Sequence, residues 1–156
     1  MHPNAALITR FYEAFQKRDA ATMAACYHED VVFSDPAFPD LRGKRAGAMW
    51  TMLCGRAKDL SIEFSEVSAD DKTGKAHWDA RYTFSTGNRV LNRIDATFEF
   101  RDGLIVKHTD HFDFKVWSGQ ALGLFGKLFG WTPFLQKRVQ SEAEKGLVAF
   151  EAKTRA

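Results

Sequence analysis

The sequence has little of what marks a specialised class of protein. In 156 residues it has two cysteines, four prolines, no run of lysine or arginine, and a net charge of only +2. Two thiols cannot form a disulfide framework, and so small a charge does not predict nucleic acid as a partner. No apolar run reaches the roughly 18 residues of a membrane-spanning helix. Disulfide-stapled, nucleic-acid-binding and membrane-spanning proteins are therefore not expected.

Targeting and metal signals are missing as well. The N-terminal residues MHPNAALITRF lack the basic start and long apolar run of a secretory signal. Cys26 and Cys54 have no histidine near them in the sequence, so we expect two reduced, inert thiols in a cytoplasmic protein. No spacing of His, Cys, Asp or Glu matches a zinc or iron motif. We predict neither a metal nor a cofactor.

The composition is that of one globular domain with an aromatic interior. Hydrophobic residues make up 45% and charged residues 27% of the chain, which is typical of a folded protein. Fourteen phenylalanines are many for this length. A chain of 156 residues is also long enough to bury a proper core.

The order of hydrophobic periods along the chain predicts an α+β fold. Helical spacing over 4–17, a short helix from an Asp19 cap to Tyr27, and a third helix after Gly43 enclose a brief strand over 31–35 and a loop over 38–42. Alternating residues then predict strands over 60–68, 76–84 and in a hairpin over 88–114, before an amphipathic helix over 134–153. A sheet with helices on one face encloses a pocket, which is the default ligand site.

The hairpin over 88–114 has polar residues within its apolar face. Its first strand alternates almost without fault, but Asn92 lies on the apolar side, and His108 and Asp110 lie on the matching side of the second strand. Polar groups in a buried face are costly unless they are satisfied or used. These three residues therefore predict a lined cavity.

The turn of this hairpin decides which residues of its second strand face inward. A two-residue turn at 102–103 would place Lys107 and Thr109 inside, whereas a three-residue loop at 102–104 would place His108 and Asp110 there. We predict the three-residue loop because it buries fewer polar groups. It sets Ala96 opposite Asp110 and Phe98 opposite His108.

Three motifs carry a resemblance to a known family. Asp35-Pro36 after the first strand, F-x-F-x-D-G over 98–103, and H-x-D-x-F-D over 108–113 resemble the SnoaL-like branch of the nuclear-transport-factor-2-like superfamily. The resemblance covers nearly the whole chain. It implies a cone-shaped, strongly curved antiparallel or mixed sheet wrapped around N-terminal helices, a C-terminal helix, a central cavity and, in many members, a homodimer.

The resemblance implies one SnoaL-like domain over 1–156, with a core cone over 1–117. The remaining residues, 118–156, would form an apolar segment and the C-terminal helix. The segment over 119–134 is very apolar, and we expect a lid over the pocket or a dimer seam there rather than a membrane contact.

Two enzymes of the superfamily suggest roles for single residues. Asp35 matches the proton-shuttling aspartate of ketosteroid isomerase, but Phe11 and Ala96 stand where that enzyme has the tyrosine and the acid of its oxyanion hole. Asp110, opposite Ala96, would present a carboxyl to similar space. Asp110 also matches the last aspartate of limonene epoxide hydrolase. The Arg-x-Asp letters of that enzyme recur at 93–95 but point outward.

We therefore predict a small-molecule-binding protein that acts as a cofactor-independent acid/base enzyme, an isomerase-like proton shuttle on a small apolar oxygenated molecule. The candidate catalytic residues are Asp35, His108 and Asp110. The candidate substrate-binding residues are Asn92, Trp50, Trp78, Tyr82, Phe11, Phe98 and Phe112. The expected partners are that molecule and a second copy of the chain, with no nucleic acid and no membrane.

Structural interpretations stay open beside these roles. Asp35 would then be a turn residue that bonds nearby backbone, His108 and Asp110 a satisfied inner pair, and the aromatic residues plain core. A non-catalytic ligand-binding or dimeric interaction module, or an epoxide-hydrolase-like hydrolase, is the alternative function.

Overall fold

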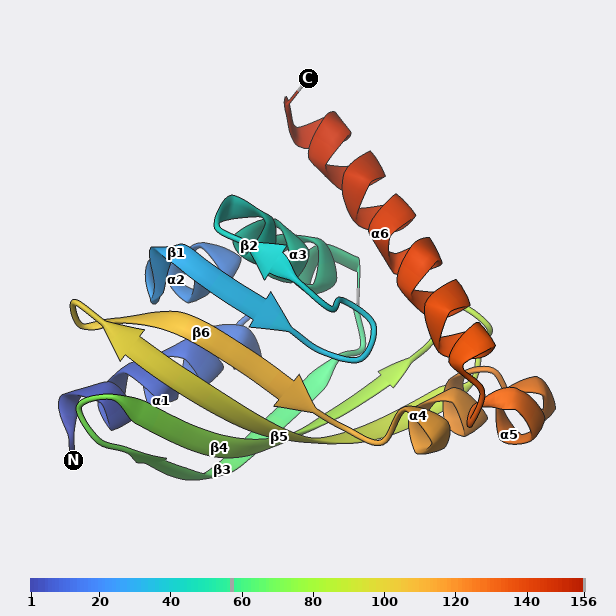
Figure 1. Cartoon of the computed structure of the whole chain (residues 1–156), viewed down its shortest axis with the longest axis horizontal. Coiled ribbons are helices and arrows are strands. Elements are labelled where there is room, and N and C mark those ends of the chain that lie inside the picture. Colours follow the sequence, from blue (N-terminus) through green and yellow to red (C-terminus); the bar gives the residue numbers. More distant parts are fainter. Residues whose placement is uncertain (57, 156) are drawn as a thin grey trace.

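A computed structural model describes residues 1–56 and 58–155 of the chain and confirms the α+β fold (Figure 1). The helices are α1 Pro3–Gln16, α2 Ala20–Ala25, α3 Lys44–Arg56, α4 Phe114–Ala121, α5 Leu124–Phe129 and α6 Pro133–Arg155. The strands are β1 Tyr27–Ser34, β2 Leu41–Arg42, β3 Ser61–Ala69, β4 Thr73–Thr83, β5 Arg89–Arg101 and β6 Leu104–His111. They form one mixed six-stranded sheet in the order β2-β1-β6-β5-β4-β3, in which β1 and β6 are parallel.

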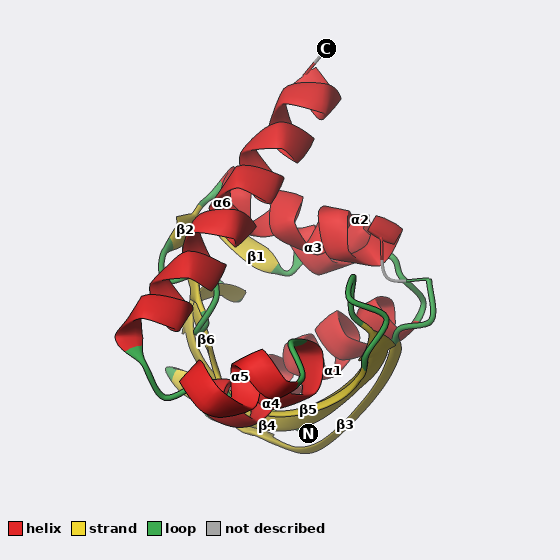
Figure 2. Ribbon diagram, turned by 90° about the vertical axis from the view of Figure 1, so that its right-hand side faces the viewer, coloured by secondary structure: helices red, strands yellow, loops and turns green. Residues whose placement is uncertain are grey.

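The sheet curves around α1, and α2 and α3 lie across the open side of the curve (Figure 2). α1 packs on the inner face of β3 and β4, while α3 contacts β1, β2 and α6. The apolar face of α1 is fully buried through Ile8, Phe11 and Tyr12, as its helical spacing predicts. The core thus lies between the concave face of the sheet and the N-terminal helices.

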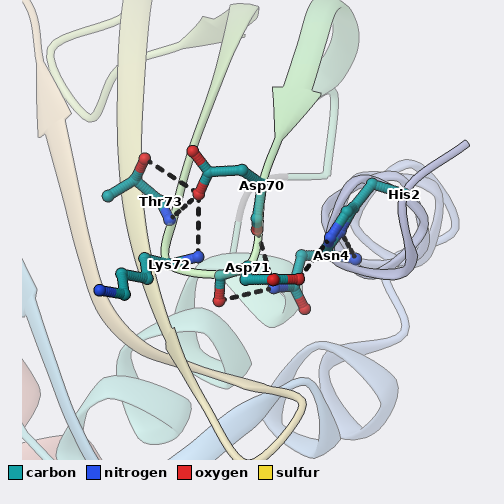
Figure 3. Close-up of polar contacts among 6 residues, drawn as sticks. All are labelled: His2, Asn4, Asp70, Asp71, Lys72 and Thr73. Carbon is teal, nitrogen blue, oxygen red and sulfur yellow. Dashed lines mark hydrogen bonds and ion pairs between the residues drawn. The ribbon is translucent and has the colours of Figure 1, made fainter.

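The start of α1 is fastened to the turn between β3 and β4 (Figure 3). The side-chain amide of Asn4 donates hydrogen bonds to the carbonyl oxygens of Asp70 and Asp71, at 3.0 and 3.3 Å. Asp70 in turn accepts from the backbone N–H groups of Lys72 and Thr73. These bonds hold the helix inside the curve of the sheet.

The first strand is longer than its sequence pattern indicates. Asp19 caps α2 through the N–H of Thr22, as predicted, but the helix ends at Ala25 and Tyr27 already belongs to β1. The register of β1 against β6 shifts between Tyr27 and Val32, which interrupts the alternation that a regular strand would have. The expected loop over 38–42 contains the two-residue strand β2.

The predicted hairpin register is confirmed, but the predicted turn is wrong. Ala96 lies opposite Asp110 and Phe98 opposite His108. The turn has two residues, because Arg101 pairs with Leu104 and both Asp102 and Gly103 have positive φ. A bulge at Val106, the extra residue between the pairs Phe100–Ile105 and Glu99–Lys107, restores the register that the shorter turn would have reversed.

The C-terminal part forms α4, α5 and α6. The buried stripe of α6 includes Leu135 and Leu147, with Val139, Ala143 and Phe150 partly buried, as its spacing predicts. The large apolar side chains of α5 are turned to solvent. In the described part of the chain, no helix combines the length and the apolar character needed to cross a membrane.

Candidate functional site

Asp35 ends the first strand in a tight turn that the sequence signals through Pro36. Its Oδ1 accepts hydrogen bonds from the backbone N–H groups of Ala37 and Phe38, at 2.7 and 2.6 Å, and its own N–H donates to the carbonyl of Phe38. Burial nevertheless raises the pKa of this carboxyl to about 7, although the two backbone donors act in the opposite direction. Asp35 therefore changes its protonation state near neutral pH.

Asp35 and Asp110 occupy matching positions on neighbouring strands. β1 and β6 run parallel, with Phe33 next to His108 and Ser34 next to Thr109, so Asp35 follows the last paired residue of β1 and Asp110 follows its partner on β6. The charge of Asp110 contributes to the raised pKa of Asp35, as expected for two carboxyl groups that share a site.

His108 and Asp110 belong to a buried chain of hydrogen bonds. Asp110 Oδ1 accepts from Trp78 Nε1 at 3.3 Å and lies 2.9 Å from His108 Nε2. His108 Nδ1 is 2.8 Å from the hydroxyl of Tyr27, which accepts from Trp50 Nε1 at 2.8 Å. With a neutral imidazole protonated at Nε2, every donor in this chain meets an acceptor. The arrangement fixes the Asp110 carboxyl in one orientation.

The aromatic residues divide into a packed interior and a rim. Phe11, Trp50 and Phe98 have 0–2% of their surface exposed, and Trp78 has 5%. The rings of Phe11, Trp50 and Phe98 surround the His108 imidazole, with Phe98 at 4.4 Å between ring centres. The structure thus gives these four residues a core position around the polar chain, and their role in substrate binding stays a prediction.

The rim contains Asn92, Tyr82 and Phe112. On the inner face, Asn92 pairs with Ala80, and Tyr82 pairs with Val90 one step towards the end of the sheet. Within the described residues, the side-chain amide of Asn92 makes no hydrogen bond. The Tyr82 hydroxyl accepts one, from Trp117 Nε1 at 2.8 Å. Both groups therefore have hydrogen-bonding capacity for a ligand.

The charge of Asp35 also reaches Tyr82. Burial is the main reason that the pKa of the Tyr82 phenol is raised, and the charge of Asp35 adds to the effect. Tyr82 and Phe112 are partly buried and contact both hydrophobic clusters of the protein. The Asp35 turn, the rim and Asp110 thus form one candidate site beside the aromatic interior.

Sequence reasoning missed the residues that hold this site in place. Tyr27 was expected at a helix end, and Trp117, which donates to Tyr82, was given no role. Gln136 and Gln140 of α6 donate side-chain hydrogen bonds to the carbonyl of Pro36, at 3.2 and 3.1 Å, and so fix the Asp35 turn from outside. Gln136 and Gln140 are four residues apart, so both lie on one face of the helix. This spacing is the signal in the sequence that indicates a shared partner.

Residues predicted to face outward do so. Asp95 Oδ1 lies 2.8 Å from His77 Nδ1, within hydrogen-bond distance, on the outer face of the sheet. Arg93 is exposed on the same face. The side chains of the Arg-x-Asp motif at 93–95 therefore lie on the opposite face of the sheet from Asp110. Among the described residues, no group of three or more His, Cys, Asp or Glu side chains is arranged to hold a metal ion.

Two hollows of the surface lie away from Asp35 and Asp110. One, of about 860 Å³, is on the outer face of the sheet between Ser68, Lys107 and His111. The other, of about 770 Å³, lies beside α4 and is lined by Arg89 and Lys127 among others. Burial raises the pKa of both free thiols, Cys26 and Cys54, which keeps them in the protonated, less reactive form.

Comparison with solved structures identifies the fold. The chain is similar to an epoxide hydrolase of the limonene epoxide hydrolase-like type from Mycobacterium tuberculosis (23% identity, 81% of this chain and 95% of that one, TM-score 0.64). It is also similar to a candidate polyketide cyclase from Xanthomonas campestris (22%, 76% and 96%, 0.64). A third relative is a hypothetical protein with a ketosteroid isomerase-like fold from Catenulispora acidiphila, in complex with trimethylamine (12%, 81% and 97%, 0.66).

At these identities the three structures establish the shared fold and not a shared reaction. No curated protein sequence matches the chain. The sequence does match the SnoaL-like domain family over residues 8–108, a range that runs from α1 to His108 and includes Asp35. The match spans well over half of the chain, so this protein belongs to the SnoaL-like domain family.

Proposed function

We propose that the protein is a cofactor-independent acid/base enzyme that moves a proton within a small apolar molecule carrying an oxygen function. The observation that carries this proposal is that Asp35 and Asp110 each follow the last residue pair of β1 and β6, beside an apolar interior, and that the pKa of Asp35 is about 7. A base of this pKa is half ionised at neutral pH, so it can both accept and return a proton. The partners proposed are this molecule and, as in many members of the family, a second copy of the chain.

In this mechanism Asp35 removes a proton from the carbon next to the substrate's oxygen function and returns it at another position. The charge that develops on the substrate oxygen would be met by hydrogen-bond donors at the rim, for which the Tyr82 hydroxyl and the Asn92 amide are available. Asp110, held by His108 and Trp78, supports the proton affinity of Asp35 through its charge.

Two other functions compete with this one. An epoxide hydrolase-like reaction has the support of a structural relative and of Asp110, but the Arg93 and Asp95 side chains that would complete it lie on the opposite face of the sheet. A non-catalytic ligand-binding module has the support of the tightly packed interior around His108. The titrating carboxyl of Asp35 favours the proton shuttle over both.

The proposal is tested by hydrogen–deuterium exchange into a panel of cyclic ketones and enones in D2O, followed by mass spectrometry or NMR. The protein should catalyse exchange at carbons next to the carbonyl of at least one panel member, with a rate that rises with pH through about 7 as Asp35 ionises. Asp35→Asn should lower that rate about 100-fold or more.

Asp95→Asn is the matched control, because it makes the same change at the residue next to Ala96 but on the outer face. It should leave exchange unchanged, and circular dichroism should give folded spectra for both variants. Panel members that bind without exchange would favour the ligand-binding module, and full activity of Asp35→Asn would exclude this carboxyl as the base.

A further inference from the structure

One end of the molecule carries an exposed apolar surface, which we call the tip. It is formed by α5 and the residues that lead into α6, at the end of the long axis opposite the N-terminus (Figure 1). Between 44% and 72% of the surface of each large side chain is exposed. These side chains are Leu124, Phe125, Leu128, Phe129, Trp131 and Phe134. Six exposed side chains of this size in one short segment are unusual for a water-facing surface.

The backbone of α5 fixes these side chains in the outward direction. Gly126 lies directly against the backbone carbonyl of Ser118 in α4, where a Cβ atom would overlap it, and Gly130 is packed against the Ser118 hydroxyl in the same way. The glycines thus form the inner side of α5, and the Trp131 indole N–H is bonded within the tip to the carbonyl of Leu128. Because the glycines occupy the side of α5 that faces α4, the apolar side chains point to solvent.

The charges around the tip are mostly positive. The sequence has no Asp or Glu from 114 to 141, whereas it has four basic residues in that stretch. Three of them, Lys115, Lys127 and Lys137, form no ion pair within the described residues. Lys115 and Lys127 also line the hollow of about 770 Å³ beside α4, with Arg89 on its other side and the Asp113 carboxylate as its one acid. Apolar side chains surrounded by cations match a surface that is apolar inside and negative outside.

We propose that the tip binds the surface of an anionic membrane, with its aromatic side chains among the lipid chains and its lysines at the lipid phosphates. A second copy of the chain is a poorer occupant, because a two-fold contact through the tip would bring Lys115, Lys127 and Lys137 of both copies together, with Asp113 as the one acid of the hollow to offset them. This proposal departs from the sequence analysis, which expects no membrane contact. It does not depend on the proposed proton shuttle.

The test is co-sedimentation of the full chain with phosphatidylcholine vesicles that contain 0 or 30% phosphatidylglycerol. The wild type should bind the anionic vesicles at 0.1 M NaCl and lose binding in 0.5 M NaCl, because salt screens the lysine contribution. Replacing Lys115, Lys127 and Lys137 by Glu should weaken binding about 100-fold or more, at about fivefold for each lost cation. Replacing Trp131 and Phe134 by Ser should weaken it roughly tenfold or more.

A triple variant with Lys44, Lys72 and Lys75 replaced by Glu is the matched control, since it changes the net charge equally at exposed positions away from the tip. It should bind within about threefold of the wild type. The proposal fails if the wild type stays in the supernatant with anionic vesicles, or if the control loses as much binding as the tip variant. A third outcome would also overturn it: the wild type is a dimer that does not bind vesicles, and the double variant Trp131→Ser, Phe134→Ser is a monomer.

Discussion

Replacing Asp35 by Asn should make the protein more stable at alkaline pH. Burial holds the folded-state pKa of Asp35 at about 7, against 3.8 for an ordinary aspartate. Between these values the unfolded chain releases the proton and the folded protein keeps it, so the free energy of unfolding falls as the pH rises and levels off above about 7. About three pKa units correspond to roughly 4 kcal/mol, of which roughly 2.5 kcal/mol falls between pH 5 and pH 8.

Asparagine removes this titration and keeps the local structure. Its side-chain oxygen accepts from the N–H groups of Ala37 and Phe38 just as the carboxyl does, at the 2.7 and 2.6 Å that the wild type has. Asp35→Asn should therefore resemble the wild type near pH 4 and exceed its stability progressively up to pH 8. A gain in stability together with a loss of proton transfer is the pattern expected of a functional residue.

The assay is urea denaturation followed by tryptophan fluorescence at pH 5, 6, 7 and 8, with the gap in unfolding free energy between variant and wild type plotted against pH. Groups that titrate independently of Asp35 cancel in this gap. Asp40→Asn, at an exposed position five residues along the chain, should give a flat line. A gap for Asp35→Asn that stays constant within about 0.5 kcal/mol would refute the burial argument.

Two further comparisons test the interior and the tip. Tyr27→Phe should lower the free energy of unfolding by about 1–3 kcal/mol in urea denaturation, because it leaves Trp50 Nε1 without its acceptor. Tyr12→Phe removes a buried hydroxyl that has no hydrogen-bond partner in the described chain, so it should be neutral or stabilising. Equal losses of stability in the two variants would contradict the assigned chain of hydrogen bonds. Gly126→Ala should release α5 from α4 and speed proteolysis of that segment, because its Cβ atom would overlap the Ser118 carbonyl. Gly55→Ala, in a helix with open space around it, should raise the free energy of unfolding by about 0.5–1 kcal/mol. If α5 stayed as resistant to protease in Gly126→Ala as in the wild type, the packing would be contradicted.

The fold was predictable because its strongest patterns are local. The alternation of β5 from Val90 to Phe98 is uninterrupted, and the residues expected on its inner face are buried, apart from Phe100, which is partly buried. The inward position of His108 and Asp110 was also predictable, from the cost of burying Lys107 and Thr109 in their place. The turn itself was not, because Asp102 and Gly103 suit both a two-residue and a three-residue connection.

The support of the site could not be predicted in the same way. Tyr27 comes two residues after the end of α2 and starts an irregular strand. Neither the two-residue spacing of apolar residues in a strand nor the 3.6-residue spacing in a helix therefore marks it as buried. Its partners Trp50 and His108 lie 23 and 81 residues away in the sequence. Gln136 and Gln140 reach Pro36 over about a hundred residues, and a single sequence records no such pairing.

The bulge at Val106 means that the pairing of one residue decides which chemistry the interior contains. If Val106 instead paired with Glu99 in a regular ladder, each later residue of β6 would exchange faces. His108 and Asp110 would then lie on the outer face, while Thr109 and His111 would lie inside the cone. Deleting Val106 would instead leave every other pair of the hairpin in place, so the bulge makes one residue dispensable for the register while its presence lets a two-residue turn keep the hydrogen-bonded chain inside.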